Sequence, residues 1–553
     1  MKRQASLYLI VIGLFLLLIS GGFLTEGLSR AGMDNAVVSQ RMAEGFEDFW
    51  LPSLSSPGNP DRMNYLPLGY WIESQWYNLF GDDSFMAEKV YSVLTFFIIA
   101  ALMIWIWRLI GMPKNTGWLP LLCWITIPIV SWSATNNLLE STMTMFILLS
   151  VAFLLKSEKA RSTMRIRQLR RIAGKQTNAN NSQWKAGFAY VGWIILAALA
   201  MELAFMVKGF SGLFPIFFPL LYWLIVERKR TGASKQSFIY PIISTVLILT
   251  VWMVTLFVAI INSPEVYHHL YNYLHHQMIG GILHVQTVAS RFYIIYVLVL
   301  QSIIPLLIIA IISLIRIKNR PFYRFVLYWH NEKKLTAMQV EHSKMGWLFL
   351  ALGLSGILPI MLGLKQQEFY VVPTLPFFAL VWGFVLYYLL QDWIENINLV
   401  AHRVLMAIAV LIFGSGLVLN VASLHKINSN EELLSDMKIL LPYLYDGECV
   451  SVSDEVMQDA EVAEYFYRYK KVTFDSNPGN VHLISIYSNV KYEYGNLRYS
   501  DMQLPTQMYR MFKLIEEPII IDTAVACTPE DSAAMQTEES LSDRLFHPLD
   551  IDY

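Results

Sequence analysis

The 553-residue chain is poor in charge and in cysteine. Only 15% of its residues are Asp, Glu, Lys or Arg, whereas 55% are hydrophobic and 14% are aromatic. A soluble protein of this length would leave large apolar patches exposed, so the composition excludes a soluble fold. The net charge of −1 by itself indicates no partner, because the charges are segregated along the chain.

The 3 cysteines are too few for a disulfide scaffold. Cys123 lies in an apolar run, where a cysteine packs as a small core residue. Cys449 and Cys527 both lie in the C-terminal region and could pair in an oxidising compartment. Their spacing alone leaves open whether they do.

Long apolar runs are what the chain has in quantity, and each approaches the ~20 residues that a helix needs to cross ~30 Å of hydrocarbon. The runs lie at residues 7–24, 90–111, 117–133, 138–155, 187–206, 209–226, 237–261, 293–315, 346–364, 369–390 and 404–422. We therefore predict an α-helical polytopic membrane protein with about 11–13 transmembrane helices over residues 1–422. The opening MKRQASLYLIVIGLFLLLISGG also fits a cleavable signal peptide. We favour a retained helix, because it would hold the acid Asp34 close to the membrane.

The orientation follows from basic segments between the runs. Residues 156–175, 227–230 and 316–324 are rich in Lys and Arg. With the N-terminus inside, all three fall on the cytoplasmic side, as the positive-inside rule requires. A basic segment can also bind nucleic acid or anionic lipid, but we interpret these as topology determinants on solvated loops and expect no nucleic-acid partner.

This orientation leaves residues 25–89, 262–292 and everything after about 423 outside the cytoplasm. The first stretch is rich in Trp, Tyr and Pro, which is typical of short amphipathic helices at the membrane interface. Residues 423–553 are expected to form a small extracytoplasmic α/β domain. Its predicted strands are 448–454, 471–476, 481–488 and 517–525, with a helix at 457–470 between the first two.

Four ionisable residues lie at the outer ends of predicted spans: Asp34, Glu140, Lys208 and Lys365. Charges at membrane depth are costly, so each needs a partner or a function. As single residues they could be helix-end charges or structural ion pairs. Their convergence on one face favours a site, because a carboxylate can take a proton from an attacking hydroxyl and Lys can neutralise phosphate.

The order of several short motifs resembles the GT-C superfamily of polyprenyl-phosphate-sugar-dependent glycosyltransferases, especially protein O-mannosyltransferases and the aminoarabinose transferase of lipid A. The matching motifs are Asp34 with the following RMAEG, the PLGYW at Pro67–Trp71, Glu140 after a short outer turn, Lys208-Gly209, and Lys365 with Tyr370, Pro373 and Pro376. The resemblance spans about residues 5–390, most of the predicted membrane part.

Two positions depart from the family pattern. Val37 stands where relatives often carry Arg, although Arg41 follows one helical turn later. Residues 64–67, Asn-Tyr-Leu-Pro, stand where the aminoarabinose transferases have EKPP, so the Lys and the metal-site Glu of that branch are missing.

The resemblance implies an inverting glycosyltransferase of the cell inner (cytoplasmic) membrane. The donor would be a sugar on a polyprenyl phosphate, and the acceptor a hydroxyl or phosphate of a lipid, glycan or protein. Asp34 would be the general base, and Glu140 would position the acceptor or the outer-loop helices. Lys208, Lys365 and Tyr370, with Arg41 or Arg291, would bind the lipid phosphate.

Histidines in the outer loop invite a metal hypothesis: His268, His269, His275 and His276. On a helix, members seven residues apart are separated by roughly 10 Å, too far to share one ion. The resemblance aligns His276 best with a family histidine. A divalent metal is therefore possible but interfacial hydrogen bonding is favoured, and no cofactor is assigned.

Other classes of function remain open at this point. A transporter or flippase for a lipid-linked sugar would show inverted repeats and charge at mid-bilayer, and we find neither. An oligosaccharide ligase or transferase would share the donor but move a whole glycan. A non-catalytic scaffold would leave the converging charges unexplained.

Overall fold

The computed structural model describes the chain in segments. These are residues 5–46, 49–50, 52, 66–81, 86–172, 179–228, 235–316, 337–477, 479–486, 493–494 and 497–515. Asn64, Tyr65, Cys527 and the predicted strand at 517–525 lie outside them, so the pairing of Cys449 with Cys527 stays a prediction.

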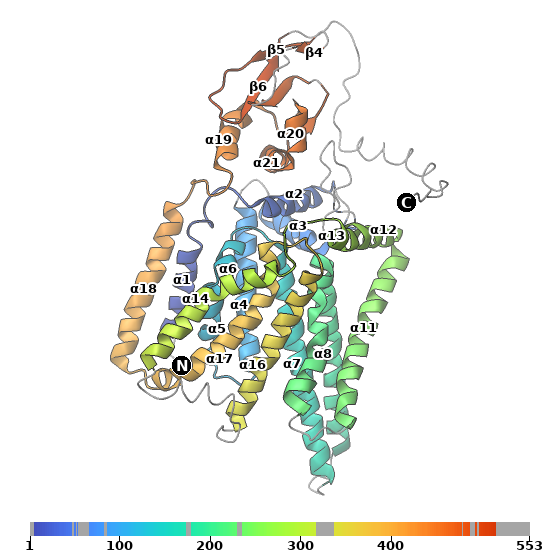
Figure 1. The fold of residues 1–553 in the computed structure, drawn as a ribbon, viewed down its shortest axis with the longest axis vertical. Coiled ribbons are helices and arrows are strands. Elements are labelled where there is room, and N and C mark those ends of the chain that lie inside the picture. Colours follow the sequence, from blue (N-terminus) through green and yellow to red (C-terminus); the bar gives the residue numbers. More distant parts are fainter. Residues whose placement is uncertain are drawn as a thin grey trace.

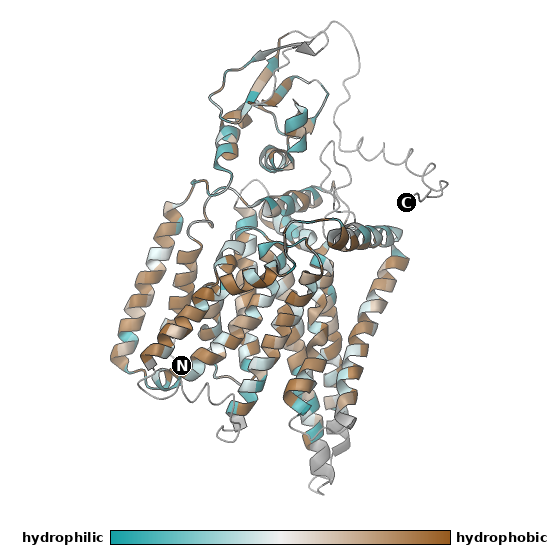
Figure 2. Ribbon diagram, in the orientation of Figure 1, coloured by the Kyte–Doolittle hydropathy of each residue, from teal (hydrophilic) through white to brown (hydrophobic). Residues whose placement is uncertain are grey.

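A bundle of apolar helices forms the larger part of the molecule (Figures 1 and 2). Its helices are α1 (Ala5–Leu18), α4 (Ala87–Leu109), α5 (Trp118–Ile125), α6 (Pro128–Ser133), α7 (Leu139–Ile172), α8 (Ala179–Lys208), α9 (Phe218–Tyr222), α11 (Lys235–Asn262), α14 (Tyr293–Arg316), α16 (Ala337–Ile357), α17 (Leu375–Glu395) and α18 (Leu399–Ala422). Within the described ranges, 8 helical stretches are long and apolar enough to cross a membrane, and α1 is a shorter apolar helix. Every predicted span contains helical structure, although α1 ends at Leu18 and the span 117–133 is divided between α5 and α6, which confirms a polytopic α-helical protein.

The predicted spans 187–206 and 209–226 lie in consecutive helical segments between Trp184 and Glu227, with a turn between them. The α-helix ends at Lys208, and Gly209 takes a φ of +76°, which suits glycine. The chain continues as the 3₁₀ helix η2 (Gly209–Phe217) before α9 and the π-helical η3 (Trp223–Glu227). The irregular turn therefore falls at the predicted functional lysine.

The bundle has a buried centre and a lipid-like periphery. In the apolar segments of α7 and α17, 78% of the residues are buried inside the protein. In those of α11 and α18, only 11% and 17% of the residues are buried. Helices that are apolar on all sides yet unburied by protein need lipid around them. The basic segment from residue 156 is not a solvated loop as expected, because α7 continues through it and Arg161 is buried against Glu158 and Glu227.

Short helices lie across one end of the bundle (Figure 1). They are α2 (Arg30–Glu44), α3 (Leu68–Phe80), α12 (Pro264–Asn272), the π-helical η4 (Tyr273–Ile279) and α13 (Gly280–Leu283). These are the stretches predicted to lie outside the spans. Tyr70 on α3 is fully buried, whereas Leu79 and Phe80 at its end are exposed, as expected for an amphipathic helix at an interface.

The C-terminal part forms a mixed six-stranded sheet with three helices. Its elements are α19 (Glu431–Leu440), β1 (Cys449–Val452), α20 (Asp454–Gln458), α21 (Ala460–Lys470), β2 (Thr473–Asp475), β3 (Val481–Ser485), β4 (Glu493–Tyr494), β5 (Leu497–Asp501) and β6 (Tyr509–Leu514). The strand order is β2-β1-β3-β6-β5-β4, with β1 parallel to β2 and β3 and the other pairs antiparallel. The structure confirms the first three predicted strands and the helical segment, and it adds β4, β5 and β6.

Helix α2 is buried from two sides. Met33, Ala36 and Val37 belong to the hydrophobic core of the C-terminal domain, whereas Val38 packs into the core of the membrane bundle. Val37 therefore has a packing role.

The N-terminal end of α2 rests on the turn that leads into α7. Asn136 Oδ1 accepts a hydrogen bond from the Ser29 backbone N–H at 2.8 Å, and the Asn35 side chain donates to the Asn137 carbonyl at 2.9 Å. A Cβ at Gly32 would lie 2.0 Å from the Asn136 carbonyl oxygen. This close approach fixes α2 relative to the start of α7.

Replacing Gly32 with Ala is expected to push α2 away from this turn. Overpacking of this kind costs about 1–3 kcal/mol, so the thermal midpoint of the detergent-solubilised protein should fall. The matched control is Gly192→Ala within α8, where an added Cβ meets nothing within 4 Å. Equal midpoints for the two variants would contradict the packing argument.

Candidate active site

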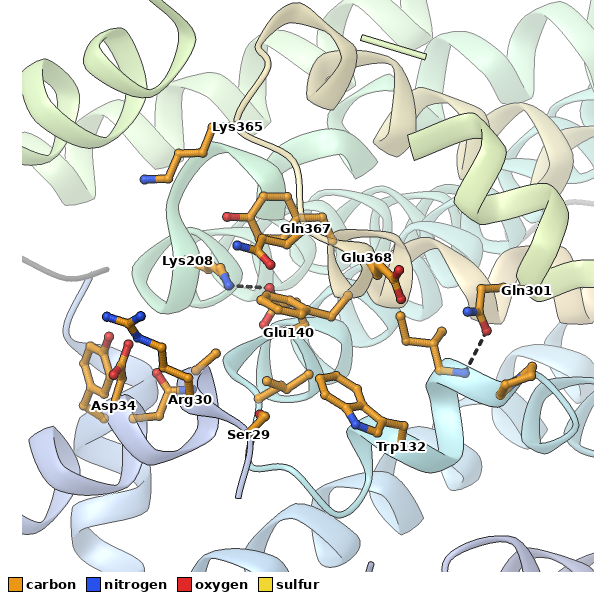
Figure 3. Close-up of a pocket in the computed structure, with 18 residues that line it drawn as sticks. Ser29, Arg30, Asp34, Trp132, Glu140, Lys208, Gln301, Lys365, Gln367 and Glu368 are labelled. Carbon is orange, nitrogen blue, oxygen red and sulfur yellow. Dashed lines mark hydrogen bonds and ion pairs between the residues drawn. The ribbon is translucent and has the colours of Figure 1, made fainter. Parts of the chain in front are cut away.

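A cavity of about 900 Å³ opens where the short outer helices meet the bundle (Figure 3). This volume is within the ~300–1,000 Å³ range of small-molecule sites. Its lining includes the four charged residues that the sequence singled out and Tyr370: Asp34, Glu140, Lys208, Lys365 and Tyr370. The structure therefore brings these five predicted residues together from four separate parts of the chain.

Glu140 and Lys208 form an ion pair at the centre of the cavity (Figure 3). Their side chains are only 2% and 8% exposed. The Lys208 ammonium also lies 5.3 Å and 5.2 Å from the ring centroids of Phe369 and Tyr370, within the range of cation–π attraction. The pair keeps a positive charge at the cavity wall while its partner carboxylate offsets the cost of burial.

Asp34 lines the same cavity from α2. Its Oδ1 is buried and has no hydrogen-bond partner among the described residues. An unpartnered carboxylate oxygen keeps unused capacity to accept a hydrogen bond. Asp34 therefore contributes a carboxyl group to the wall of the cavity.

Arg30 is a cavity residue that the sequence analysis missed. It begins α2, one turn before Asp34, and Figure 3 shows both side chains at the same end of the cavity. The i, i+4 spacing of Arg30 and Asp34 on a helix was the available signal.

Lys365 is held in place by its neighbour Gln366. The Gln366 amide donates to the carbonyls of Arg291 and Gly363, at 3.0 Å and 2.9 Å, and accepts from the Ile294 N–H at 2.9 Å. Thr287 Oγ1 accepts from the Gln366 backbone N–H and donates to its carbonyl, each at 2.9 Å. Because Gln366 is buried and fully engaged, the segment that presents Lys365 is rigid at the cavity rim.

Two other predicted site residues lie outside the lining of the cavity. The Arg41 guanidinium lies over the Tyr467 ring of the C-terminal domain, 5.5 Å from its centroid, and Arg41 is not in the cavity lining. Arg291 is exposed and outside the lining, and its carbonyl accepts a hydrogen bond from the Gln366 side chain. His276 lies in η4, and its side chain is outside the described part.

His269, one of the four histidines in the loop at 262–292, is buried. His269 on α12 is 2% exposed, and neither ring nitrogen has a hydrogen-bond partner among the described residues. Burial lowers the pKa of His269 to about 4, so the ring stays neutral at physiological pH. In the described residues, no group of three or more His, Cys, Asp or Glu side chains could hold a metal ion. The metal hypothesis on His276 stays a prediction.

A buried carboxyl, Glu73 on α3, connects the elements that carry the two site acids. It accepts hydrogen bonds from Ser39 Oγ on α2 at 2.8 Å and from Asn137 Nδ2, before Glu140, at 2.6 Å. Burial, assisted by the nearby Glu88 carboxylate, raises the pKa of Glu73 to about 8. Glu73 is therefore protonated at neutral pH.

The pKa of Glu73 predicts a pH-dependent stability. Between about pH 4.5 and pH 8 the folded state keeps a proton on Glu73 that the unfolded chain releases. Because the folded state binds more protons, the free energy of unfolding should fall as the pH rises through this window. Glu73→Gln, which is permanently neutral, should lose this part of the pH dependence in thermal unfolding from pH ~5 to ~8. Parallel curves for wild type and Glu73→Gln would contradict the assignment.

Comparison with known proteins identifies the architecture. No protein-family model and no curated protein sequence matches the chain. The crystal structure of ArnT from Cupriavidus metallidurans in the apo state is similar, with a TM-score of 0.53 at 13% sequence identity, over 91% of this chain and 97% of ArnT. The chain has a GT-C fold. The expected fold class is thereby confirmed.

Two further structures match this chain. ArnT from the same organism bound to undecaprenyl phosphate gives the same TM-score of 0.53 and the same coverage. An oligosaccharyltransferase from Archaeoglobus fulgidus, tethered to an acceptor peptide, matches with a TM-score of 0.40 at 10% identity, over 86% of this chain and 64% of that protein.

Proposed function

We propose that this GT-C protein is an integral-membrane inverting glycosyltransferase that takes a sugar from a polyprenyl-phosphate donor. The observation that carries the proposal is the single cavity lined by Asp34, Glu140, Lys208 and Lys365. It combines the Asp34 carboxyl, whose Oδ1 has no hydrogen-bond partner among the described residues, with ammonium groups suited to a phosphate. The ArnT structure with undecaprenyl phosphate supports a lipid-phosphate ligand for this fold.

The proposed reaction is a direct displacement at the anomeric carbon. Asp34 removes the proton from the acceptor hydroxyl, and the acceptor oxygen attacks the anomeric carbon from the face opposite the phosphate. The bond between that carbon and the phosphate oxygen breaks, and its electron pair stays on the phosphate. The products are the glycosylated acceptor and the polyprenyl phosphate, with inverted configuration at the sugar.

The cations of the cavity would stabilise the leaving phosphate. Lys208 and Lys365 would neutralise the charge that develops on it, and the Tyr370 hydroxyl would donate a hydrogen bond. Arg30 extends the same role at the end of the cavity near Asp34. We leave Arg41 out of this set because its guanidinium lies over Tyr467.

The proposed membrane orientation follows from α7. This helix begins beside the cavity with Glu140 and runs for 34 residues into the basic segment from residue 156. The positive-inside rule assigns the basic end to the cytoplasm. The C-terminal domain and the short helix α2, which contributes to the cavity, lie at the other end of the bundle in Figure 1 and would then face the outside of the cytoplasmic membrane.

The test is transfer by the purified protein in lipid vesicles. A radiolabelled polyprenyl-phosphate sugar is incubated with the protein and a crude envelope extract, and label is followed into protein, lipid and glycan fractions. We expect time-dependent product in one fraction and release of polyprenyl phosphate. Movement of the donor across the vesicle membrane without product would favour a flippase and contradict the proposal.

A further inference from the structure

The C-terminal domain and the helix of the proposed base share one hydrophobic core. Met33, Ala36 and Val37 of α2 pack with buried residues of α19, α21 and the sheet. The hydroxyl of Tyr465 on α21 accepts from the Leu28 backbone N–H at 3.1 Å and donates to the Leu28 carbonyl at 2.9 Å. Leu28 directly precedes the N-terminal turn of α2, so the domain holds this helix at its base.

A buried ion pair joins the same domain to the membrane bundle. Arg468 Nη2 on α21 lies 2.9 Å from Glu88 Oε2, in the first turn of α4, and the side chains are 3% and 2% exposed. The guanidinium carbon also lies 5.4 Å from the centroid of the Tyr77 ring on α3. A buried pair with this geometry fixes α21 relative to α3 and α4, because separation would leave a buried charge unpaired.

The pair continues as a chain of hydrogen bonds toward the cavity. The Tyr77 hydroxyl lies 3.4 Å from Glu88 Oε2 and 3.2 Å from Glu73 Oε1. Glu73 in turn accepts from Ser39 on α2 and from Asn137, in the turn before Glu140. Arg468 is thus connected through buried side chains to both elements that carry the site acids.

We propose that Arg468 is a positioning residue and that the C-terminal domain is a clamp on α2 that sets Asp34 against the cavity. The catalytic part of this inference rests on the proposed function. The domain itself lines no part of the cavity in the described residues. The C-terminal domain would therefore affect the reaction by placing Asp34, and would not affect donor binding.

The first test compares Arg468→Met with Arg510→Met, which removes an exposed arginine from β6 of the same domain. Misplacing a reacting group by about 1 Å can cost ~10²-fold in rate, so Arg468→Met should lower kcat by at least about tenfold. The KM for the polyprenyl-phosphate sugar should stay within about twofold, since Lys208 and Lys365 are untouched. Arg510→Met should behave as wild type. An unchanged kcat in Arg468→Met would overturn the inference.

Hydrogen exchange provides a readout that needs no transferase activity. In Arg468→Met, amide exchange in residues 30–44 should accelerate, whereas exchange in residues 139–155 of α7 should not change. If the wild type transfers no sugar, the proposed function fails. This measurement still tests whether the C-terminal domain holds α2 in place. Unchanged protection of α2, or equal loss of protection in α2 and α7, would refute it.

Two further variants guard against simple misfolding. Glu88→Gln combined with Arg468→Met removes both buried charges, so the fold should be retained while kcat stays low. Tyr465→Phe deletes only the hydroxyl that binds Leu28 and should lower kcat in the same direction by a smaller factor. Wild-type kcat in both variants would show that the contacts serve stability alone and would overturn the inference.

Discussion

Replacing Asp34 with Asn is expected to abolish sugar transfer while leaving the protein folded and inserted in the membrane. Asn keeps the size of the side chain but cannot accept the proton of an acceptor hydroxyl. General-base catalysis typically contributes ~10²–10⁴-fold, so kcat should fall by about that factor. Since the unpartnered Oδ1 makes no hydrogen bond among the described residues, its loss should cost little stability.

The measurement is kcat with the radiolabelled donor, together with binding of undecaprenyl phosphate and the thermal midpoint. The matched control is Asp446→Asn, because Asp446 is 81% exposed in the C-terminal domain and far from the cavity lining. Near-normal transfer by Asp34→Asn would refute its assignment as the base. It would also favour an acceptor, such as a phosphate, that needs no deprotonation.

Lys208→Met is expected to have the second-largest effect. The substitution keeps the apolar stem but removes the ammonium that the leaving phosphate would meet. Losing one preorganised electrostatic group typically costs ~10²–10³ in kcat. It also leaves the Glu140 carboxylate buried without its partner, a change that destabilises proteins by about 3–5 kcal/mol.

The double variant Lys208→Met with Glu140→Gln separates these two effects. With both charges gone, the thermal midpoint should recover toward that of the wild type. Transfer and binding of undecaprenyl phosphate should remain low, because the phosphate still lacks its cation. Recovery of transfer together with stability would mean that Lys208 serves the fold and not the donor.

The spans and four of the five cavity residues could be predicted because their signals are local, whereas Tyr370 was predicted from the family resemblance. Apolar runs reveal a membrane helix without knowledge of its neighbours. A charge at the end of such a run must lie at one membrane surface, and alternation of the spans decides which. Asp34, Glu140, Lys208 and Lys365 were predicted to converge in this way and do so.

What supports these residues could not be predicted, because it depends on pairings far apart in the sequence. Ser39 and Glu73 are 34 positions apart, and Arg468 and Glu88 are 380 apart. Polar residues such as Gln366 also give no periodic signal in a loop. Arg41 was expected at the phosphate from its place on α2, but the face that carries it is covered by the C-terminal domain.

The burial of α2 from two sides has a consequence for protein engineering. Val37 packs with the C-terminal domain and Val38 with the membrane bundle, so adjacent residues of one helix belong to different cores. A chimera that grafts the C-terminal domain of a protein of similar fold onto this bundle would place foreign side chains against Met33, Ala36 and Val37. Such a graft should assemble only when residues 30–44 are redesigned. The face of α2 that packs on the bundle would keep its present residues, and the face that packs on the C-terminal domain would take those of the donor protein.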